Sequence, residues 1–172
     1  MARKKVRLGD RNPWTFRWKP MDADWKERLL KRKGEREGTV DKQRLRDGLM
    51  AFGGDFVLIP HLEEDLAAIL SRGVLRTGVG AQLEAGAPNQ CHSNTVRLYA
   101  QNKDNPDGSI AIATGYALGK DGLWRQHTWG VWYDEDFENG LVVETTVRMA
   151  GYFGFEMTAA EAEKFSRDNE WW

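Results

Sequence analysis

The chain has 172 residues, of which 41% are hydrophobic and 30% charged, and its formal net charge at pH 7 is −1, values typical of a single soluble globular domain. No apolar run approaches the roughly 18 residues of a membrane span, and the first ten residues are charged with no apolar segment behind them, so we expect a cytoplasmic protein without membrane contact. The single cysteine, Cys91, excludes an internal disulfide and any zinc site made from several cysteines. We expect no metal and no cofactor.

Charge is distributed unevenly along the chain. Residues 1–46 contain 16 Lys and Arg against 7 Asp and Glu, whereas residues 47–172 contain 9 against 19. We therefore divide the chain into a basic, tryptophan-bearing N-terminal segment, 1–46, and a main domain, 47–172. A basic segment of this kind can bind nucleic acid, an acidic partner or the acidic remainder of its own fold.

The basic segment contains three alternating aromatic residues, Trp14, Phe16 and Trp18. Aromatic residues between basic ones suit stacking on single-stranded nucleic acid. Large aromatic side chains more often cover a hydrophobic core, so we favour a short edge strand at this place. A basic helix over residues 22–33 is expected to follow and to pack lightly on the domain.

Hydrophobic periodicity and turn residues predict a mixture of helices and strands in the rest of the chain. We expect helices over residues 40–50, 61–70, 91–102 and 158–168, strands over 56–59, 110–118, 123–132 and 141–147, and a loop over 78–89. The segment 119–122 is expected to close a hairpin. The three later strands then form an antiparallel meander.

Cys91 stands at the start of the helix predicted over residues 91–102. Free backbone N–H groups and the positive end of the helix dipole favour an anion there. A thiol with the ordinary pKa of about 8.5 needs such a site to react as a thiolate at neutral pH. His92 follows directly, but adjacent helical residues point about 100° apart, so we expect His92 to face away from the thiol. The alternative interpretation of Cys91 is a buried structural thiol.

His127 is the better partner for Cys91, because it lies in a run of aromatic and β-branched residues that predicts a strand. Glu144, in the middle of the next predicted strand, is the expected orienting group for His127.

The register of these two strands decides whether His127 and Glu144 meet. If a loop over about 132–139 joins the strands, Val131 pairs with Gly140 and His127 lies opposite Glu144. If residues 139 and 140 form a tight turn instead, the two side chains are separated. We prefer the first register because the acidic run 134–136 makes a poor strand.

The order of the three groups resembles that of the papain-like superfamily, which includes transglutaminase-like and NlpC/P60-like enzymes. A cysteine opens a helix, a histidine follows 36 residues later on a strand, and a carboxylate lies 17 residues further, on the next strand. The resemblance covers about residues 86–150. It implies an α+β fold with a papain-like core, in which the helix with the cysteine packs on an antiparallel sheet, and a basic N-terminal extension.

Cysteine catalysis also needs donors for an oxyanion. The backbone N–H of Cys91 is one candidate and the side chain of Gln90 or Asn94 a second, although Asn94 also suits a local cap. Papain-like proteases have a glutamine several residues ahead of the cysteine, whereas here Gln90 precedes it directly. Trp129 shares a strand face with His127 and is expected to shield the histidine from water.

The sequence therefore predicts a cysteine hydrolase or acyltransferase that acts on an amide, isopeptide or thioester bond of a peptide-like substrate through a triad of Cys91, His127 and Glu144. The alternative is a non-catalytic module that binds nucleic acid or protein through the basic segment. A third possibility is a papain-like fold that has lost catalysis and serves as an interaction module.

Overall fold

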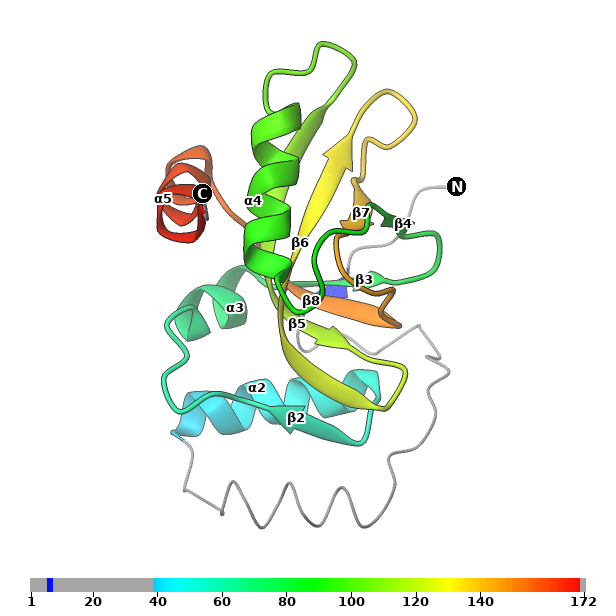
Figure 1. The fold of residues 1–172 in the computed structure, drawn as a ribbon. Coiled ribbons are helices and arrows are strands. Elements are labelled where there is room, and N and C mark those ends of the chain that lie inside the picture. The colour runs from blue at the N-terminus through cyan, green and yellow to red at the C-terminus, as the bar shows by residue number, and fades with distance from the viewer. Residues whose placement is uncertain (1–5, 8–38, 171–172) are drawn as a thin grey trace.

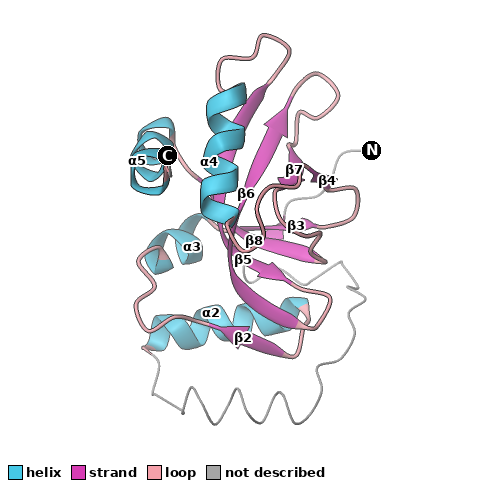
Figure 2. Cartoon of the chain, viewed as in Figure 1, coloured by secondary structure: helices cyan, strands magenta, loops and turns pink. Residues whose placement is uncertain are grey.

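The structure is a computed structural model and describes residues 6–7 and 39–170. It combines helices with one curled sheet in which most strand pairs are antiparallel (Figures 1 and 2), so the predicted α+β class is confirmed. The edge strand and basic helix predicted for residues 13–33 lie outside the described residues. No helix in the described part of the chain is both long and apolar enough to cross a membrane.

Within the described residues, eight strands form the sheet, in the hydrogen-bonded order β1-β3-β8-β5-β6-β7-β4, and β2 pairs with β6 outside this path. The strands are β1 (Val6–Arg7), β2 (Phe56–Leu58), β3 (Val74–Thr77), β4 (Gln82–Leu83), β5 (Ser109–Leu118), β6 (Leu123–Tyr133), β7 (Leu141–Glu144) and β8 (Gly151–Glu156). The helices are α2 (Val40–Phe52), α3 (Leu66–Arg72), α4 (Cys91–Asn102) and α5 (Ala159–Asn169).

The hairpin of β5 and β6 is the centre of the sheet. Its register runs from Ser109 opposite Tyr133 to Leu118 opposite Trp124. Gly122 adopts a φ of 80° in the connecting turn, a backbone conformation that glycine accepts without strain. The predicted hairpin is confirmed.

The outer edge of β6 is divided between two partners. β2 pairs in parallel with residues 123–125, and β7 pairs antiparallel with residues 130–132. Residues 126–129 of this edge therefore have no strand partner within the described chain. Helix α4 begins beside this gap, where the hydroxyl of Thr95 donates to the carbonyl of Thr128 over 3.3 Å.

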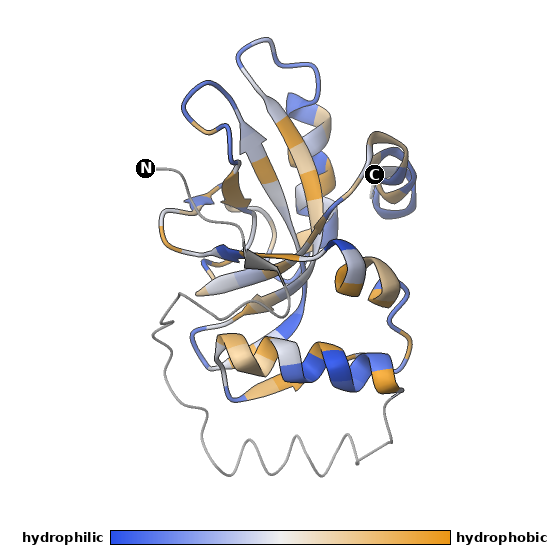
Figure 3. Cartoon of the chain, turned by 180° about the vertical axis from the view of Figure 1, so that it is seen from behind, coloured by the Kyte–Doolittle hydropathy of each residue, from blue (hydrophilic) through white to orange (hydrophobic). Residues whose placement is uncertain are grey.

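Hydrophobic side chains cover both faces of the sheet. On one face, α2 and α3 pack over a core that includes Phe153, and α4 and α5 pack over a smaller cluster around Val96 and Ile112. The opposite face of β5 and β6 carries a cluster that includes Trp129 and Tyr152. Figure 3 shows both hydrophobic and hydrophilic residues on α2 and α5, as expected of helices that bury one side.

Helix α2 crosses the boundary that we placed between residues 46 and 47. Leu45 and Leu49, one turn apart on this helix, are both 0% exposed and lie in the same core. Residues 40–46 therefore fold together with the domain that follows them.

Four strands, β1, β3, β4 and β8, were not predicted. The sequence of β8 contains two glycines that obscure the alternation of a strand. Gly154 is needed there because a Cβ atom at this position would lie 2.1 Å from the carbonyl oxygen of Thr114 on β5. The close approach of two strands selects the residue that local propensity disfavours.

The helix predicted over residues 61–70 begins later, at Leu66. Glu63 turns inward instead and is only 7% exposed. Its carboxylate accepts hydrogen bonds from the Tyr116 hydroxyl and, over 3.3 Å, from the Gln126 amide. A buried carboxylate requires such donors, so this tertiary contact overrides the local helical pattern.

The substitution Leu45→Ala is expected to lower the free energy of unfolding by about 2–5 kcal/mol, because it leaves a cavity in the core. Val40→Ala, at a position of the same helix that is 85% exposed, is the control and is expected to change it by less than about 0.5 kcal/mol. Urea denaturation monitored by circular dichroism measures both. Equal, small effects would show that residues 40–46 do not belong to the core.

Candidate active site

Cys91 is the first residue of α4, as predicted, and is partly exposed. Asn89, two residues earlier, has a φ of 59°, a left-handed conformation that asparagine tolerates. The backbone N–H of Asn94 donates to the carbonyl of Gln90 over 2.9 Å, and the N–H groups of the first turn therefore have no helical acceptor. The thiol lies at the positive end of the helix dipole, where a thiolate is favoured.

His127 and Glu144 form a buried pair. Nε2 of His127 lies 3.1 Å and 2.9 Å from the two carboxylate oxygens of Glu144, and the two residues are 4% and 0% exposed. The predicted contact is confirmed. Because Nε2 faces the carboxylate, Nδ1 is the ring nitrogen left for the thiol.

The register predicted for this contact is wrong by two residues, since Val131 pairs with Val142 instead of Gly140. In the loop that joins the two strands, the Asp134 carboxylate accepts the N–H groups of Asp136 and Phe137 over 3.0 Å and 2.8 Å, and the chain reverses one residue later than predicted. A shift of two residues leaves every side chain on its original face. His127 and Glu144 therefore meet diagonally and not directly opposite each other.

Glu144 accepts four further hydrogen bonds. The donors are the N–H of Thr145 (2.9 Å), the N–H and hydroxyl of Thr146 (2.8 Å and 2.9 Å) and the hydroxyl of Tyr152 (2.9 Å). Burial alone would raise the pKa of Glu144, but the bonds and charge from His127 and the bonds from Thr146 lower it below its ordinary value. The carboxylate is ionised and fixed. It also ends β7 three residues earlier than predicted, because it takes the two N–H groups that follow.

The thiol and the imidazole shift each other's ionisation. Burial alone would raise the pKa of Cys91, but hydrogen bonds and charge from His127 and His92 lower it to about 6. Burial alone would lower the pKa of His127, but its bonds to Cys91 and Glu144 raise it to about 9. The thiolate forms above the first value and the imidazolium persists below the second. Between about pH 6 and about pH 9 the two groups form an ion pair.

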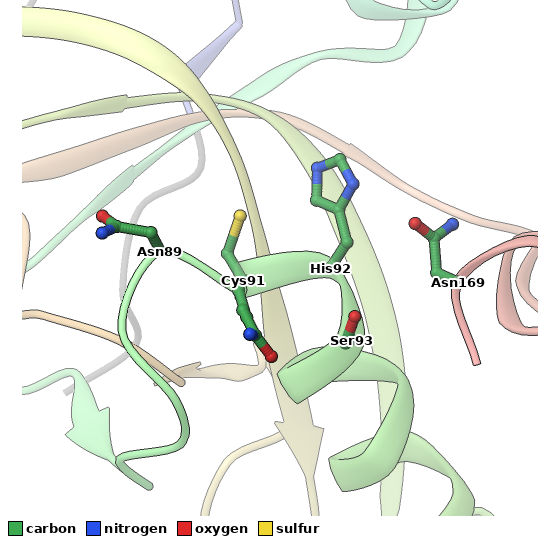
Figure 4. Close-up of a pocket in the computed structure, with 6 residues that line it drawn as sticks. Asn89, Cys91, His92, Ser93 and Asn169 are labelled. Atoms are coloured by element: carbon green, nitrogen blue, oxygen red, sulfur yellow. The ribbon is translucent and has the colours of Figure 1, made fainter. Parts of the chain in front are cut away.

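His92 does not face away from the thiol, and our expectation for this residue was wrong. Figure 4 shows the Cys91 sulfur and the His92 ring on the same side of the helix start. Helical side chains lean toward the N-terminus, which brings the ring back toward the preceding residue. Its hydrogen bond to Cys91, opposed by burial, raises the pKa of His92.

A pocket of about 490 Å³ opens beside Cys91. It is lined by Asn89 and Gln90 from the loop before α4, by Cys91, His92 and Ser93 from the first turn of α4, and by Asn169 from the end of α5 (Figure 4). Gln90 is exposed and makes no side-chain cap to the helix. Its amide is therefore placed to contact a molecule in this pocket.

Asn94 is committed to the fold. Its amide nitrogen donates to the carbonyls of Ala87 and Thr145 over 2.8 Å and 3.2 Å, and its oxygen accepts the N–H of Ala87 over 3.0 Å. Both amide hydrogens are used, so a role as oxyanion donor would require one of these bonds to break. Asn94 instead ties the loop before Cys91 to the end of β7.

Trp129 is 1% exposed and therefore cannot contact a substrate. It shields the histidine, as expected, because its ring stacks on His127 with centroids 6.3 Å apart and packs on Tyr152 at 5.1 Å. Its indole nitrogen has no hydrogen-bond partner among the described residues. The buried rings of Trp129 and Tyr152 therefore cover the imidazole on the side away from the pocket.

Several residues of this site were not predicted from the sequence. Tyr152 and Thr146 complete the shell of Glu144, and Asn169 approaches from the last turn of α5. The position of His92 next to Cys91 was a signal for its contact with the thiol, but the angle of about 100° between adjacent helical residues predicted the opposite. In the part of the chain that the structure describes, no group of three or more His, Cys, Asp or Glu is placed to hold a metal ion.

Glu144→Gln removes the charge beside His127 and is expected to lower the pKa of that imidazole by about 1–3 units from its value near 9. The stabilisation that the raised pKa provides is complete below the unfolded pKa of about 6.5 and is lost as pH rises through about 9. The variant should therefore lose most stability at neutral and mildly acidic pH, and the loss should shrink at lower pH, where Glu144 itself is protonated. NMR titration of the His127 ring measures the shift. Glu163→Gln, at an exposed pair with Lys103, is the control; an unchanged His127 titration in Glu144→Gln would contradict the assigned coupling.

Comparisons with family models, with curated proteins and with solved structures each found no match to this chain. The chemistry of the site is therefore the basis for a function.

Proposed function

We propose that this protein is a papain-like, thiol-dependent hydrolase or acyltransferase that acts on an amide, isopeptide or thioester bond of a peptide-like substrate. The observation that carries the proposal is the meeting of three groups from separate elements. A partly exposed thiol at a helix start contacts a buried imidazole, which is held by a buried carboxylate. Such a relay activates a nucleophile, and here the thiol opens onto a pocket.

In the first step, the Cys91 thiolate attacks the carbonyl carbon of the substrate. A sulfur–carbon bond forms, and the carbonyl oxygen becomes an oxyanion. The backbone N–H of Cys91 has no helical acceptor and is one donor for this oxygen, and the exposed amide of Gln90 is a second. The bond to the leaving group then breaks, which leaves an acyl group on the sulfur.

In the second step, water or another nucleophile attacks the acyl group, and the thiolate leaves. Glu144 holds the His127 ring through Nε2, so Nδ1 always faces the sulfur. The imidazolium is stabilised by a fixed charge whose four other donors need no rearrangement during the reaction. Hydrolysis and acyl transfer differ only in the second nucleophile.

Two other functions predicted from the sequence have weaker support. Binding of nucleic acid or an acidic partner rests on the basic segment, most of which lies outside the described residues. A papain-like interaction module without catalysis predicts a thiol with an ordinary pKa, whereas the contacts of Cys91 lower its pKa to about 6.

Cys91→Ala is expected to abolish turnover, with a loss of more than about a thousandfold, because no other residue supplies the nucleophile. Short peptide thioesters and p-nitrophenyl esters serve as acyl donors, and mass spectrometry of the digested protein locates the acyl group. Arg97→Ala, at an exposed position on the same helix, is the control and should retain full activity. Turnover that persists in folded Cys91→Ala protein would overturn the proposal.

A further inference from the structure

Two histidines approach the sulfur of Cys91, and they differ in access. His127 is almost fully buried and has Glu144 on one ring nitrogen and the thiol on the other. His92 is only partly buried and lines the pocket that holds the thiol. A group that enters or leaves the acyl carbon from the solvent side therefore meets His92 and not the buried ring.

The His92 ring is held in place by α5. The Cys91 thiol and the Asn169 side chain are close enough to the ring to raise the pKa of His92 through hydrogen bonding, and the edge of the ring meets Phe165 with centroids 5.4 Å apart. Figure 4 shows the ring between the Cys91 sulfur and the Asn169 amide. Asn169 thus orients His92 much as Glu144 orients His127, but with a neutral partner.

His92 also lines a second pocket of about 560 Å³, which continues from the first between α5 and the loop before α3. His92 and Asn169 belong to both pockets. The other charged groups of the second pocket are Glu64, Asp65, Glu161, Asp168 and Lys164. Glu161 is paired with Arg72 at 2.7 Å, so three carboxylates face a single lysine. This pocket favours a cation.

Three titratable groups interact electrostatically with His92. They are Cys91 on its own helix, His127 on β6 and Asp65 before α3. The thiolate and the carboxylate favour the protonated form of His92, and the His127 imidazolium opposes it. Proton exchange at His92 is therefore coupled to the charge on the sulfur, which disappears when the acyl group forms.

We propose that His92 is a second acid–base residue, which exchanges a proton with an amine that is bound in the second pocket and joins or leaves the acyl group on Cys91. This inference rests on the proposed function. When an amine joins, its neutral nitrogen attacks the acyl carbon, His92 takes one proton from the nitrogen, the carbon–sulfur bond breaks, and the thiolate returns to its pair with His127. When an amide is cleaved, the same proton moves from His92 to the leaving nitrogen. The preferred amine carries a second positive charge, as a diamine or a lysine-containing peptide does.

The test separates the two half-reactions with defined probes. A p-nitrophenyl ester acylates Cys91 and releases an anion that needs no proton, and 1,5-diaminopentane then removes the acyl group. His92→Gln should slow the aminolysis by about 100-fold or more relative to the ester acylation. It should also remove one inflection from the pH profile of aminolysis, which a merely structural role would leave in place. His61→Gln, the same change at an exposed histidine outside both pockets, should alter neither step.

The acceptor preference gives a second readout. The diamine should react faster than 5-aminopentan-1-ol, and high salt should reduce the difference because it screens the acidic pocket. Equal losses in both half-reactions of His92→Gln, or no loss, would overturn the role of His92 while the acyl-enzyme still supported the proposed function. If the wild-type protein forms no acyl-enzyme, the proposed function is wrong, and the role proposed for His92 is then wrong as well.

Discussion

The buried carboxylate of Glu144 is the constraint on which the site depends. An ionised group with no exposed surface is stable only if donors surround it. Here the donors come from His127 on β6, from Thr145 and Thr146 where β7 ends, and from Tyr152 on β8. The positions of three strands are therefore tied to one charge, and the imidazole that reaches Cys91 can take only one orientation.

The gap in the outer edge of β6 allows Cys91 to reach the imidazole that the Glu144 charge holds in place. Helix α4 packs on one face of the β5–β6 hairpin, and His127 points to the other face, where Trp129 lies. Between β2 and β7 the edge is open, and α4 begins there, so its first residue reaches the imidazole around the edge. Asn94 and Thr95 fix this geometry by bonding to Thr145 and Thr128. The thiol of Cys91 is thus exposed to the pocket on one side and lies against the buried pair of His127 and Glu144 on the other.

Local signals predicted the parts of the site, and tertiary contacts decided how they join. The helix start at Cys91 and the strand with His127 follow from periodicity, and their structure agrees with the prediction. The pairing register depends on the loop that contains Asp134, and it moved by two residues without separating the pair. Strand β8 was not predicted because it contains Gly154, a residue with low strand propensity that is required by the close approach of β5. The orientation of His92 depends on α5, which is 60 or more residues away in the chain and lies beyond any local pattern.

The pairing of Cys91 with His127 is tested by the pH dependence of Cys91 alkylation by iodoacetamide, in the wild-type protein and in His127→Ala, with the fold of each checked by circular dichroism. We expect an inflection near pH 6 in the wild-type protein, because the imidazolium stabilises the thiolate. In His127→Ala the inflection should move toward the ordinary thiol value of about 8.5. An inflection near that ordinary value in both proteins would contradict the account and would make Cys91 a structural thiol.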